Sequence, residues 1–383
     1  MVAVTIRLIL LWLSGIVLRI TVLAVPPVIP LIHRDLHLSQ AGVGLLTALP
    51  SLLFAAAAVP GSLLVAKLGP VRALVTGLLI TSFASALRGA ATHAQILYGA
   101  TFFMGAGIAV MQPTLPRVVR DWLPERIGFG TAVYSNGLLV GELLSVSLTG
   151  PYLVPLLGGS WRLAMVFWAL PVLAAALLVT FLAPRQAGAR TSGAPAAWWP
   201  DWKNPLIWRL GFILGCVNTL YFGTNFFLPD YLHHTGRPEM VDRALTALNL
   251  YQLPSSILLL LFAGKLTRWN VSYIASGMLL FASLLGIVFA PGGWIIFFTG
   301  IFGFVNAAAF ILILALPPLL TEPQDVHRVS AGMFTISYSC AVAIPIVSGF
   351  LWDVTRVPLL VFLPIGLCAL VIIALSLKLR LAR

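Results

Sequence analysis

Near its start the sequence reads Leu8-Ile-Leu-Leu-Trp-Leu-Ser-Gly-Ile-Val-Leu-Arg19-Ile-Thr-Val-Leu-Ala-Val-Pro26-Pro27-Val-Ile-Pro30, and this stretch decides the class of fold. Its only charge is that of Arg19. An α-helix needs about 20 mostly apolar residues to cross the hydrocarbon core of a bilayer. The stretch is longer than the core of a signal peptide, and a second apolar stretch follows it directly. We therefore expect a membrane helix that is retained.

The rest of the chain repeats this pattern, with short polar joints between apolar stretches. Twelve spans are predicted, at residues 8–32, 41–66, 70–90, 95–118, 128–155, 162–183, 206–231, 244–264, 271–290, 293–320, 329–352 and 358–379. Transmembrane β-barrels are built from strands of about ten residues with alternating polarity, which continuous apolar runs do not provide. The predicted fold class is therefore an all-α membrane protein with twelve transmembrane helices.

The composition agrees with a membrane protein. Of the 383 residues, 60% are hydrophobic and 9% are charged, whereas soluble proteins carry about 25% charged residues. Cys216, Cys340 and Cys368 fall inside apolar spans and have neither paired spacing nor clustered His or Asp partners. We therefore expect no disulfide framework, no metal site and no cofactor.

The net charge of +12 is explained by where the basic residues lie. Sixteen of the 23 lysines and arginines are predicted on the side of the N-terminus, and Arg19 lies within the membrane. The six predicted on the opposite side are Arg34, Arg88, Arg162, Arg237, Arg243 and Arg356. Cytoplasmic loops carry the excess of basic residues, so both termini are predicted to be cytoplasmic. We expect a multi-pass protein of the bacterial inner (cell) membrane, with no nucleic-acid partner.

The polar stretch from Pro184 to Pro205 separates two sets of six spans. The two sets echo each other at Pro30 and Pro229, Leu49-Pro50 and Leu253-Pro254, Lys67-Leu68 and Lys265-Leu266, Leu115-Pro116 and Leu316-Pro317, and Gly130 and Gly332, with offsets between 198 and 204 residues. Such offsets fit two halves related by an axis along the membrane normal, with the solute site at their interface. Chance similarity of apolar segments is the alternative. The predicted domains are an N-terminal six-helix bundle (1–183), a cytoplasmic linker (184–205) and a C-terminal six-helix bundle (206–383).

Arg19 is the main candidate for a solute-binding residue. It lies in the middle of the first span, where an arginine costs roughly 2.5–3.5 kcal/mol on insertion scales and keeps its charge. We expect an anion to visit such a charge. The alternative is a structural arginine that is paired to carbonyl groups or reaches the membrane surface. A depth of about 16 Å from the predicted start of the helix leaves the surface poorly accessible to it.

Glu142 is the other charge that the sequence places well inside a span, at a similar depth. Its helix face mixes small and polar residues and should line a cavity or pack on a neighbouring helix. That face consists of Tyr134, Leu138, Gly141, Glu142, Ser145 and Thr149. Because the charge of a buried carboxyl group depends on its surroundings, we expect Glu142 to be charged while it faces Arg19 and to take up a proton when an anion binds the arginine. A fixed ion pair or a packing hydrogen bond is the alternative.

Further polar residues inside the spans are candidates for hydrogen bonds to the solute. Aligning Pro30 with Pro229 puts Asn218 opposite Arg19. The other candidates are Tyr134, Tyr221, Asn225, Tyr338, Asn306, Gln112, Asn249 and Gln252. Each has the alternative role of a contact between helices. All six histidines fall in or beside the predicted loops, so we expect no histidine proton relay in the membrane.

Four groups of residues together carry a family resemblance. They are Leu18-Arg19 with Pro26-Pro27-Val28-Ile29-Pro30, then Leu36-His-Leu-Ser-Gln-Ala-Gly-Val-Gly-Leu-Leu-Thr-Ala-Leu-Pro50, then Gln112-Pro-Thr-Leu-Pro-Arg-Val-Val-Arg120 followed by Leu123-Pro124 and Gly128, and finally Gly159-Ser-Trp-Arg162. In combination they resemble the major facilitator superfamily, and more narrowly its cyanate and nitroimidazole transporter family. The resemblance covers nearly the whole chain.

The resemblance implies the major facilitator fold and the transport of small anionic or polar compounds, with direction and substrate differing between members. It also implies a conformational loop between the second and third helices, which here carries Lys67, Gly69 and Arg72. Ala66 stands where the superfamily usually has an acidic residue.

Other functional classes lack their usual sequence features. A pump driven by ATP needs a Gly-x-x-x-x-Gly-Lys-Ser/Thr loop, which does not occur here. A membrane enzyme needs a catalytic cluster, and Asp230, His233 and His234 have no partner residues. A channel usually shows rings of pore-lining residues. We therefore predict no catalytic residues.

The prediction is a secondary active transporter that carries a small anion such as cyanate, a nitrate-like ion or a carboxylate by alternating access. It is expected to be proton-coupled, embedded in the lipid bilayer and functional as a monomer. The alternative is an efflux carrier for neutral or aromatic drug-like compounds such as nitroimidazoles.

Overall fold

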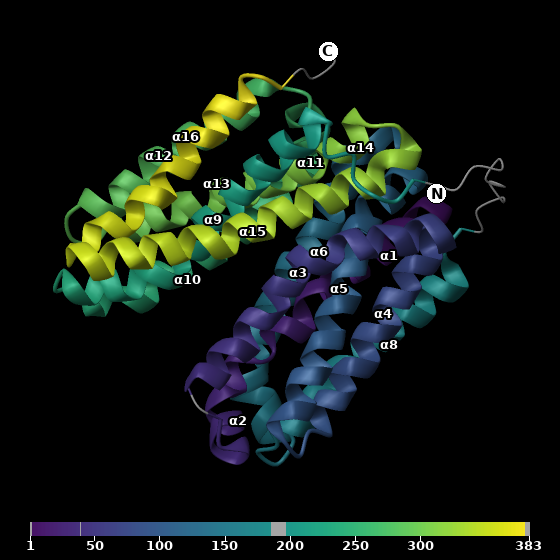
Figure 1. The fold of residues 1–383 in the computed structure, drawn as a ribbon, viewed down its shortest axis with the longest axis horizontal. Helices are drawn as coiled ribbons and strands as arrows, with labels where there is room; N and C mark the ends of the chain where they lie inside the picture. The colour runs from purple at the N-terminus through teal and green to yellow at the C-terminus, as the bar shows by residue number, and fades with distance from the viewer. Residues whose placement is uncertain (1, 39, 185–196, 380–383) are drawn as a thin grey trace. The chain divides into compact units, whose positions relative to one another are not determined.

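The computed structural model describes residues 2–38, 40–184 and 197–379, and the regular secondary structure of these residues is entirely helical (Figure 1). Twelve helical spans in this part of the chain are long and apolar enough to cross a membrane. The predicted all-α class with twelve transmembrane helices is therefore confirmed. Residues 185–196, which make up most of the predicted linker, lie outside the described residues.

The first six spans contain α1 (Val2–Leu23), η1 (Pro26–Val28), α2 (Ile29–Leu36), α3 (Gln40–Leu68), α4 (Pro70–Gly89), α5 (Ala94–Trp122), η2 (Pro124–Arg126), α6 (Ile127–Leu148), the π-helical turn η3 (Thr149–Leu153), α7 (Val154–Leu156) and α8 (Trp161–Leu182). The last six contain α9 (Pro205–His234), η4 (Pro238–Met240), α10 (Val241–Leu250), α11 (Gln252–Leu266), α12 (Asn270–Phe289), α13 (Trp294–Leu314), α14 (Leu316–Leu320), η5 (Pro323–Asp325), α15 (Val326–Thr355), η6 (Pro358–Val361) and α16 (Phe362–Ser376).

Three of the spans that begin earlier than the apolar runs predict share one feature. They start at Pro124, Pro238 and Pro323, whereas the predicted starts are 128, 244 and 329. In each case a 3-10 turn with charged residues precedes the apolar helix. Proline suits the first turn of a helix because its missing amide would have no partner there. The apolar run therefore starts only after these charged residues, whereas the helical structure starts before them.

The chain divides into two compact units. Unit 1 comprises Met1–Glu125, Val133–Asp201 and Thr321–Ala331, and unit 2 comprises Arg126–Ala132, Trp202–Leu320 and Gly332–Arg383. Two short segments belong to the unit other than that of their neighbours in the chain: Arg126–Ala132 to unit 2 and Thr321–Ala331 to unit 1. They contain the starts of α6 (Ile127) and α15 (Val326), which are 199 residues apart. This offset falls within the 198–204 range of the sequence repeat. The predicted bundle limits, 1–183 and 206–383, remain a prediction.

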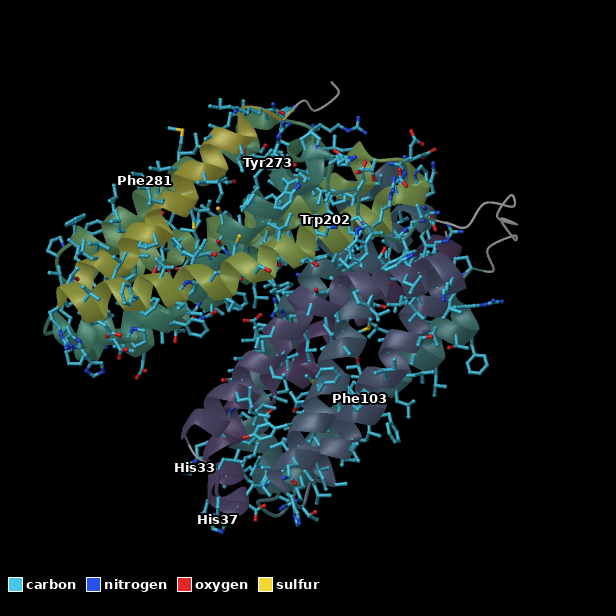
Figure 2. All side chains as sticks on the ribbon, in the orientation of Figure 1. His33, His37, Phe103, Trp202, Tyr273 and Phe281 are labelled. Atoms are coloured by element: carbon cyan, nitrogen blue, oxygen red, sulfur yellow. The ribbon has the colours of Figure 1, made fainter. Side chains whose placement is uncertain are left out.

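Each unit has a core of packed helices and an apolar outer surface. In unit 1, α4 packs against α5 and α8, while in unit 2 α12 packs against α13 and α16 (Figure 1). Large apolar side chains also point outward, for example Phe103, which is 58% exposed on α5 (Figure 2). Helices that are apolar on their outer faces are suited to contact with lipid.

Helices α1 and α6 approach each other closely in unit 1. A Cβ atom at Gly15, Gly137 or Gly141 would collide with the carbonyl oxygen of Tyr134, Trp12 or Ile16, respectively. Small residues at such positions let two helix backbones touch, which is a main source of helix association in membranes. The contacts pair residue 12 with 137 and residue 16 with 141, so the two helices run parallel.

Replacing Gly141 with alanine is expected to destabilise the protein by about 1–3 kcal/mol, because the added methyl group has no space against the backbone of Ile16. The measurement is thermal unfolding of the purified protein in detergent. Gly99→Ala is the matched control, because Gly99 also lies within a helix but has no atom within 4 Å of its Cβ position. It should leave the stability unchanged or raise it by up to about 1 kcal/mol. Equal effects of the two substitutions would contradict the close packing.

Candidate functional site

Arg19 and Glu142 lie on the adjoining helices α1 and α6. Arg19 follows Ile16 by three residues, so it lies on the same side of α1 as the contact with Gly141 and about 4.5 Å further along. Glu142 is next to Gly141 in the chain. The heights of the two charged residues therefore differ by about one helical turn at most. Both side chains are half-buried.

Both residues lie near the middle of their spans. The first span extends from Val4 to Leu36 and the fifth from Pro124 to Leu156. Arg19 is fifteen residues from the start of its span, and Glu142 is eighteen from the start of its own. The sequence-based expectation of similar depth therefore agrees with the positions of the helices. The roles assigned to the two residues remain predictions.

Much of the mixed small and polar face of α6 packs against neighbouring helices. Gly141 contacts α1. Ser145 and Thr149 are both 0% exposed. The Ser145 hydroxyl donates to the Gly141 carbonyl at 2.9 Å, and the Thr149 hydroxyl donates to the Ser145 carbonyl. Trp168 of α8 donates its indole N–H to the Thr149 hydroxyl at 2.8 Å. Of the two roles left open by the sequence, packing is the one these residues fulfil.

The first span is interrupted just beyond Arg19. Pro26 and Pro27 have no amide hydrogen, and α1 ends at Leu23 before η1 begins. The amide of Val25 donates to the Val22 carbonyl at 3.4 Å, one residue short of the α-helical partner. The carbonyl of Thr21 consequently loses the amide donor that a continuous helix would supply.

Arg88 of α4 supplies the missing donor. Its Nη2 atom donates to the Thr21 carbonyl at 2.7 Å and to the Ser85 hydroxyl at 3.3 Å. The Arg88 side chain is 0% exposed, as are Thr21 and Ser85. A hydrogen bond from a charged group is among the stronger bonds in proteins. Arg88 therefore fixes the backbone at the break in the first span, two residues beyond Arg19.

The sequence analysis counts Arg88 among the basic residues on the side opposite the termini, within the predicted span 70–90, and does not predict its burial. The structure buries Arg88 completely inside unit 1. The signal that could have revealed it is the pair Pro26-Pro27, which leaves carbonyl groups without amide donors and so requires a donor from a neighbouring helix.

Neutral polar residues form a connected network in unit 2. Tyr221 donates its hydroxyl to Asn249 Oδ1 at 2.6 Å, and Asn249 Nδ2 donates to Asn225 Oδ1 at 3.1 Å. Asn225 Nδ2 donates in turn to the Tyr221 carbonyl at 2.9 Å, and Gln252 Nε2 donates to Asn249 Oδ1 at 3.4 Å. The network joins α9, α10 and α11. Tyr221, Asn225 and Asn249 are half-buried, so each retains an accessible edge.

The other candidates of unit 2 are more deeply buried. Asn218 is 4% exposed, and its Nδ2 donates to the Ser337 hydroxyl at 2.8 Å, which ties α9 to α15. Tyr338 is 2% exposed on α15, and Phe334 stacks beside it at a centroid distance of 6.3 Å. Asn306 of α13 is 4% exposed, and its Oδ1 has no hydrogen-bond partner among the described residues.

In unit 1 the structure adds a bond that sequence reasoning missed. Trp12 of α1 donates its indole N–H to Asn136 Oδ1 of α6 at 2.9 Å. The candidates Tyr134 and Gln112 are 2% and 8% exposed, respectively. Asn136 is a polar residue inside an apolar span, which is the same signal that selected the other amides. Tyr134 and Asn136 belong to α6, the helix of Glu142, and Gln112 belongs to α5.

The predicted conformational loop lies between α3 and α4. Gly69 has a φ angle of +80°, a conformation that glycine adopts without strain. Lys67 and Arg72 flank it and are exposed. The role of these three residues in conformational change remains a prediction.

The described residues contain no cluster of three or more His, Cys, Asp or Glu side chains arranged to hold a metal ion. The three cysteines, Cys216, Cys340 and Cys368, are free. Arg19 and Glu142 are the charged candidates, and the neutral network of unit 2 offers hydrogen-bond donors and acceptors.

Comparison with known proteins gives a family match over most of the chain. The model of the Major Facilitator Superfamily matches residues 11–342. The cyanate transport protein CynX of Escherichia coli is 24% identical over 353 residues, covering 91% of this chain and 90% of that protein. The 2-nitroimidazole transporter of Escherichia coli is 27% identical over 342 residues, covering 88% of this chain and 85% of that protein.

Solved structures match the fold. The Major Facilitator Superfamily transporter FucP in the outward conformation is 14% identical and gives a TM-score of 0.75, with 98% of this chain and 99% of that chain covered. At this level of identity the similarity establishes the fold alone.

Replacing Arg88 with alanine is expected to lower the stability by about 1–3 kcal/mol, because the buried Thr21 carbonyl is left without a donor. Thermal unfolding of the purified protein measures the effect. Arg72→Ala is the matched control, since Arg72 is an exposed arginine on the same helix and should have an effect within about 0.5 kcal/mol. A variant at residue 88 that is as stable as the control would contradict the bond to α1.

Proposed function

The chain belongs to the Major Facilitator Superfamily, and from this membership we propose that it carries a small anion across the membrane by alternating access, together with a proton. The protein is a membrane transporter with twelve spans. The observation that carries the anion proposal is a permanently charged arginine in the middle of the first span. Residues with fixed charge inside a membrane are costly and usually mark the path of a solute or ion.

The chemistry of Arg19 selects anions. Its guanidinium group presents several N–H donors in a plane and keeps its charge at all physiological pH values. Such a group recognises planar carboxylates and linear or trigonal anions through charge-assisted hydrogen bonds. Arg19 lies on the α6-facing side of α1 and is half-buried. The name of the cyanate transport protein, a relative that covers 91% of this chain, agrees with this class of substrate.

Glu142 provides a route for coupling to protons. It lies within about one helical turn of the height of Arg19 on the adjoining helix. A carboxylate near an arginine is favoured as the charged form, and an anion that takes the arginine removes this stabilisation. Glu142 would then bind a proton while the anion is bound and release it afterwards. Anion and proton would cross the membrane as a neutral pair.

The polar groups of unit 2 would add specificity. The network of Tyr221, Asn225, Asn249 and Gln252 offers both donors and acceptors. Such groups orient a small ligand without favouring one sign of charge. Tyr338 and Asn306 are buried candidates for the same role, as are Tyr134 and Gln112 in unit 1.

Further features of the proposal rest on the distribution of charge. Both termini would face the cytoplasm, because sixteen of the 23 basic residues are predicted on their side. The protein would reside in the inner membrane of a bacterium and act as a monomer. Lys67, Gly69 and Arg72 would form the loop that changes between the conformations of the transport cycle.

Arg19→Ala is expected to weaken anion uptake by about 10- to 100-fold, which corresponds to the loss of a hydrogen bond to a charged group. Uptake of labelled cyanate, nitrate and acetate into proteoliposomes measures this loss. Arg19→Lys should retain part of the activity. Arg34→Ala is the matched control, because Arg34 is an exposed arginine in the same span. Uptake of 2-nitroimidazole, but of no anion, by the unmodified protein would favour the alternative carrier function and overturn the anion proposal.

Glu142→Gln is expected to abolish accumulation driven by a pH gradient while exchange of labelled for unlabelled anion continues. A glutamine at this position keeps the shape of the side chain but cannot carry the proton. Uptake with an acidic exterior is compared with counterflow at equal pH in the same proteoliposomes. Glu125→Gln serves as the control, because Glu125 is an exposed acidic residue of the same span. Retained gradient-driven accumulation in the residue-142 variant would exclude Glu142 as the coupling group.

A further inference from the structure

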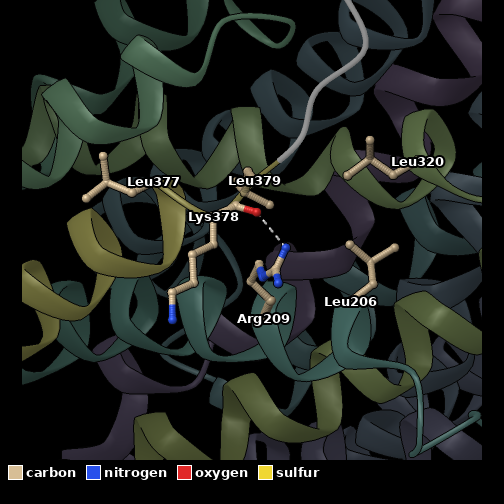
Figure 3. A pocket seen from close by; sticks show the side chains of 6 residues that line it. All are labelled: Leu206, Arg209, Leu320, Leu377, Lys378 and Leu379. Carbon is tan, nitrogen blue, oxygen red and sulfur yellow. Dashed lines mark hydrogen bonds between the residues drawn. The ribbon is translucent and has the colours of Figure 1, made fainter.

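A pocket of about 610 Å³ lies at one end of unit 2. Its lining consists of Leu206, Arg209, Leu320, Leu377, Lys378 and Leu379 (Figure 3). The volume falls within the roughly 300–1,000 Å³ range of pockets that bind small molecules or parts of larger ligands. The pocket is formed by residues of unit 2 only, and it is separate from the polar network around Asn249.

The pocket lies where three spans end. Leu206 and Arg209 belong to the first turns of the span that starts at Pro205, and Leu320 is the last residue of the span from Trp294. Leu377 to Leu379 directly follow the last span, which ends at Ser376. The start of the seventh span and the ends of the tenth and twelfth lie on the same side of the membrane, because successive spans alternate in direction. The pocket is therefore at the level where hydrocarbon meets the polar head groups.

An exposed tryptophan next to the pocket supports this depth. Trp208, the residue before Arg209, is 43% exposed and donates its indole N–H to the Trp202 carbonyl at 2.8 Å. Tryptophan is enriched at both membrane surfaces, where its ring contacts the acyl region and its N–H group bonds to polar partners.

The lining has two cations and no acidic residue. Neither Arg209 nor Lys378 forms an ion pair with a carboxylate of the described residues. Arg209 Nη1 donates to the Lys378 carbonyl at 2.7 Å, a bond that places the guanidinium group inside the pocket (Figure 3). Its remaining N–H groups and the ammonium group of Lys378 are the donors offered to a ligand.

The other four lining residues are leucines, and they place apolar surface beside the cations. In Figure 3, Leu377 and Leu206 lie on opposite sides of the two charged side chains. Leu377 is 66% exposed, so the apolar surface continues from the pocket to the outside of the unit. A ligand that fits must therefore be negatively charged at one end and apolar at the other.

We propose that this pocket binds the phosphate-containing head group of an anionic phospholipid, with the acyl chains lying along Leu377. Basic pockets between transmembrane helices at the membrane surface are the recognised form of such sites. The proposal does not depend on the transported solute, because the pocket shares no residue with the Arg19 and Glu142 region.

The test is native mass spectrometry of the full-length protein with phosphatidylglycerol and with phosphatidylcholine of identical acyl chains. The unmodified protein is expected to retain phosphatidylglycerol preferentially. Lys378→Gln should reduce this retention by about fivefold, the effect of removing one basic residue near a membrane surface, and should leave phosphatidylcholine binding unchanged. This variant keeps the backbone carbonyl that Arg209 contacts, so folding should be preserved. Arg209→Gln should reduce retention at least as much.

Lys265→Gln is the matched control, because Lys265 is an exposed lysine at the end of α11 in the same unit and does not line the pocket. Equal retention by the residue-378 and residue-265 variants would overturn the proposal. So would equal binding of the two lipids by the unmodified protein. A second experiment adds inorganic phosphate or glycerol 3-phosphate to the protein. If either compound displaces the lipid, or stabilises the protein as strongly as phosphatidylglycerol does, the site recognises a soluble phosphate instead of a lipid.

Discussion

The absence of water from the bilayer interior is the constraint on which this structure depends. Each backbone amide and carbonyl group in that region must find its partner within the protein, which limits the spans to helices. Pro26 and Pro27 violate this requirement because they remove two donors from the first span. The nearby Thr21 carbonyl is satisfied by Arg88, a side chain from another helix. A charged residue is thus used where a continuous helix would use an amide.

Two arginines near the break in the first span consequently have different surroundings. Arg88 is fully enclosed and bonded to the backbone of α1 and to Ser85. Arg19, two residues before Thr21, is half-buried on the side of α1 that faces α6. The first arginine fixes the backbone, and the position of the second depends on that backbone. The accuracy with which Arg19 is held is therefore partly determined by α4, a helix that contributes none of the predicted solute-binding residues.

The sequence predicts the fold well because the apolar run needed to cross a bilayer is long and leaves little ambiguity. All twelve spans are present, and the largest displacements, of six residues, are at the two starts Pro238 and Pro323, where a proline and charged residues precede the apolar run. The polar residues are harder. Helical spacing identifies Ser145 and Thr149 as residues of one helix face, but it cannot show that Trp168 packs against that face and bonds to Thr149. The burial of Arg88 cannot be predicted from its own stretch of sequence, because it depends on α1, 67 residues away. The network around Asn249 likewise joins three helices, and the pattern of residues within each helix does not show which residues of the other helices lie beside it.

The distribution of charge between the units has a consequence for selectivity. In unit 2 the half-buried network consists of amides and a phenol that satisfy one another, so it is stable in the membrane without a ligand. Amide groups donate and accept hydrogen bonds equally well and do not distinguish an anion from a neutral solute of the same shape. In unit 1 the mid-span groups are charged, and a charge in a medium of low dielectric constant acts strongly on any charged ligand nearby. Under the proposal that Arg19 binds an anionic solute, discrimination against neutral compounds would come from its charge, because the neutral network of unit 2 could contribute only selection by size and orientation.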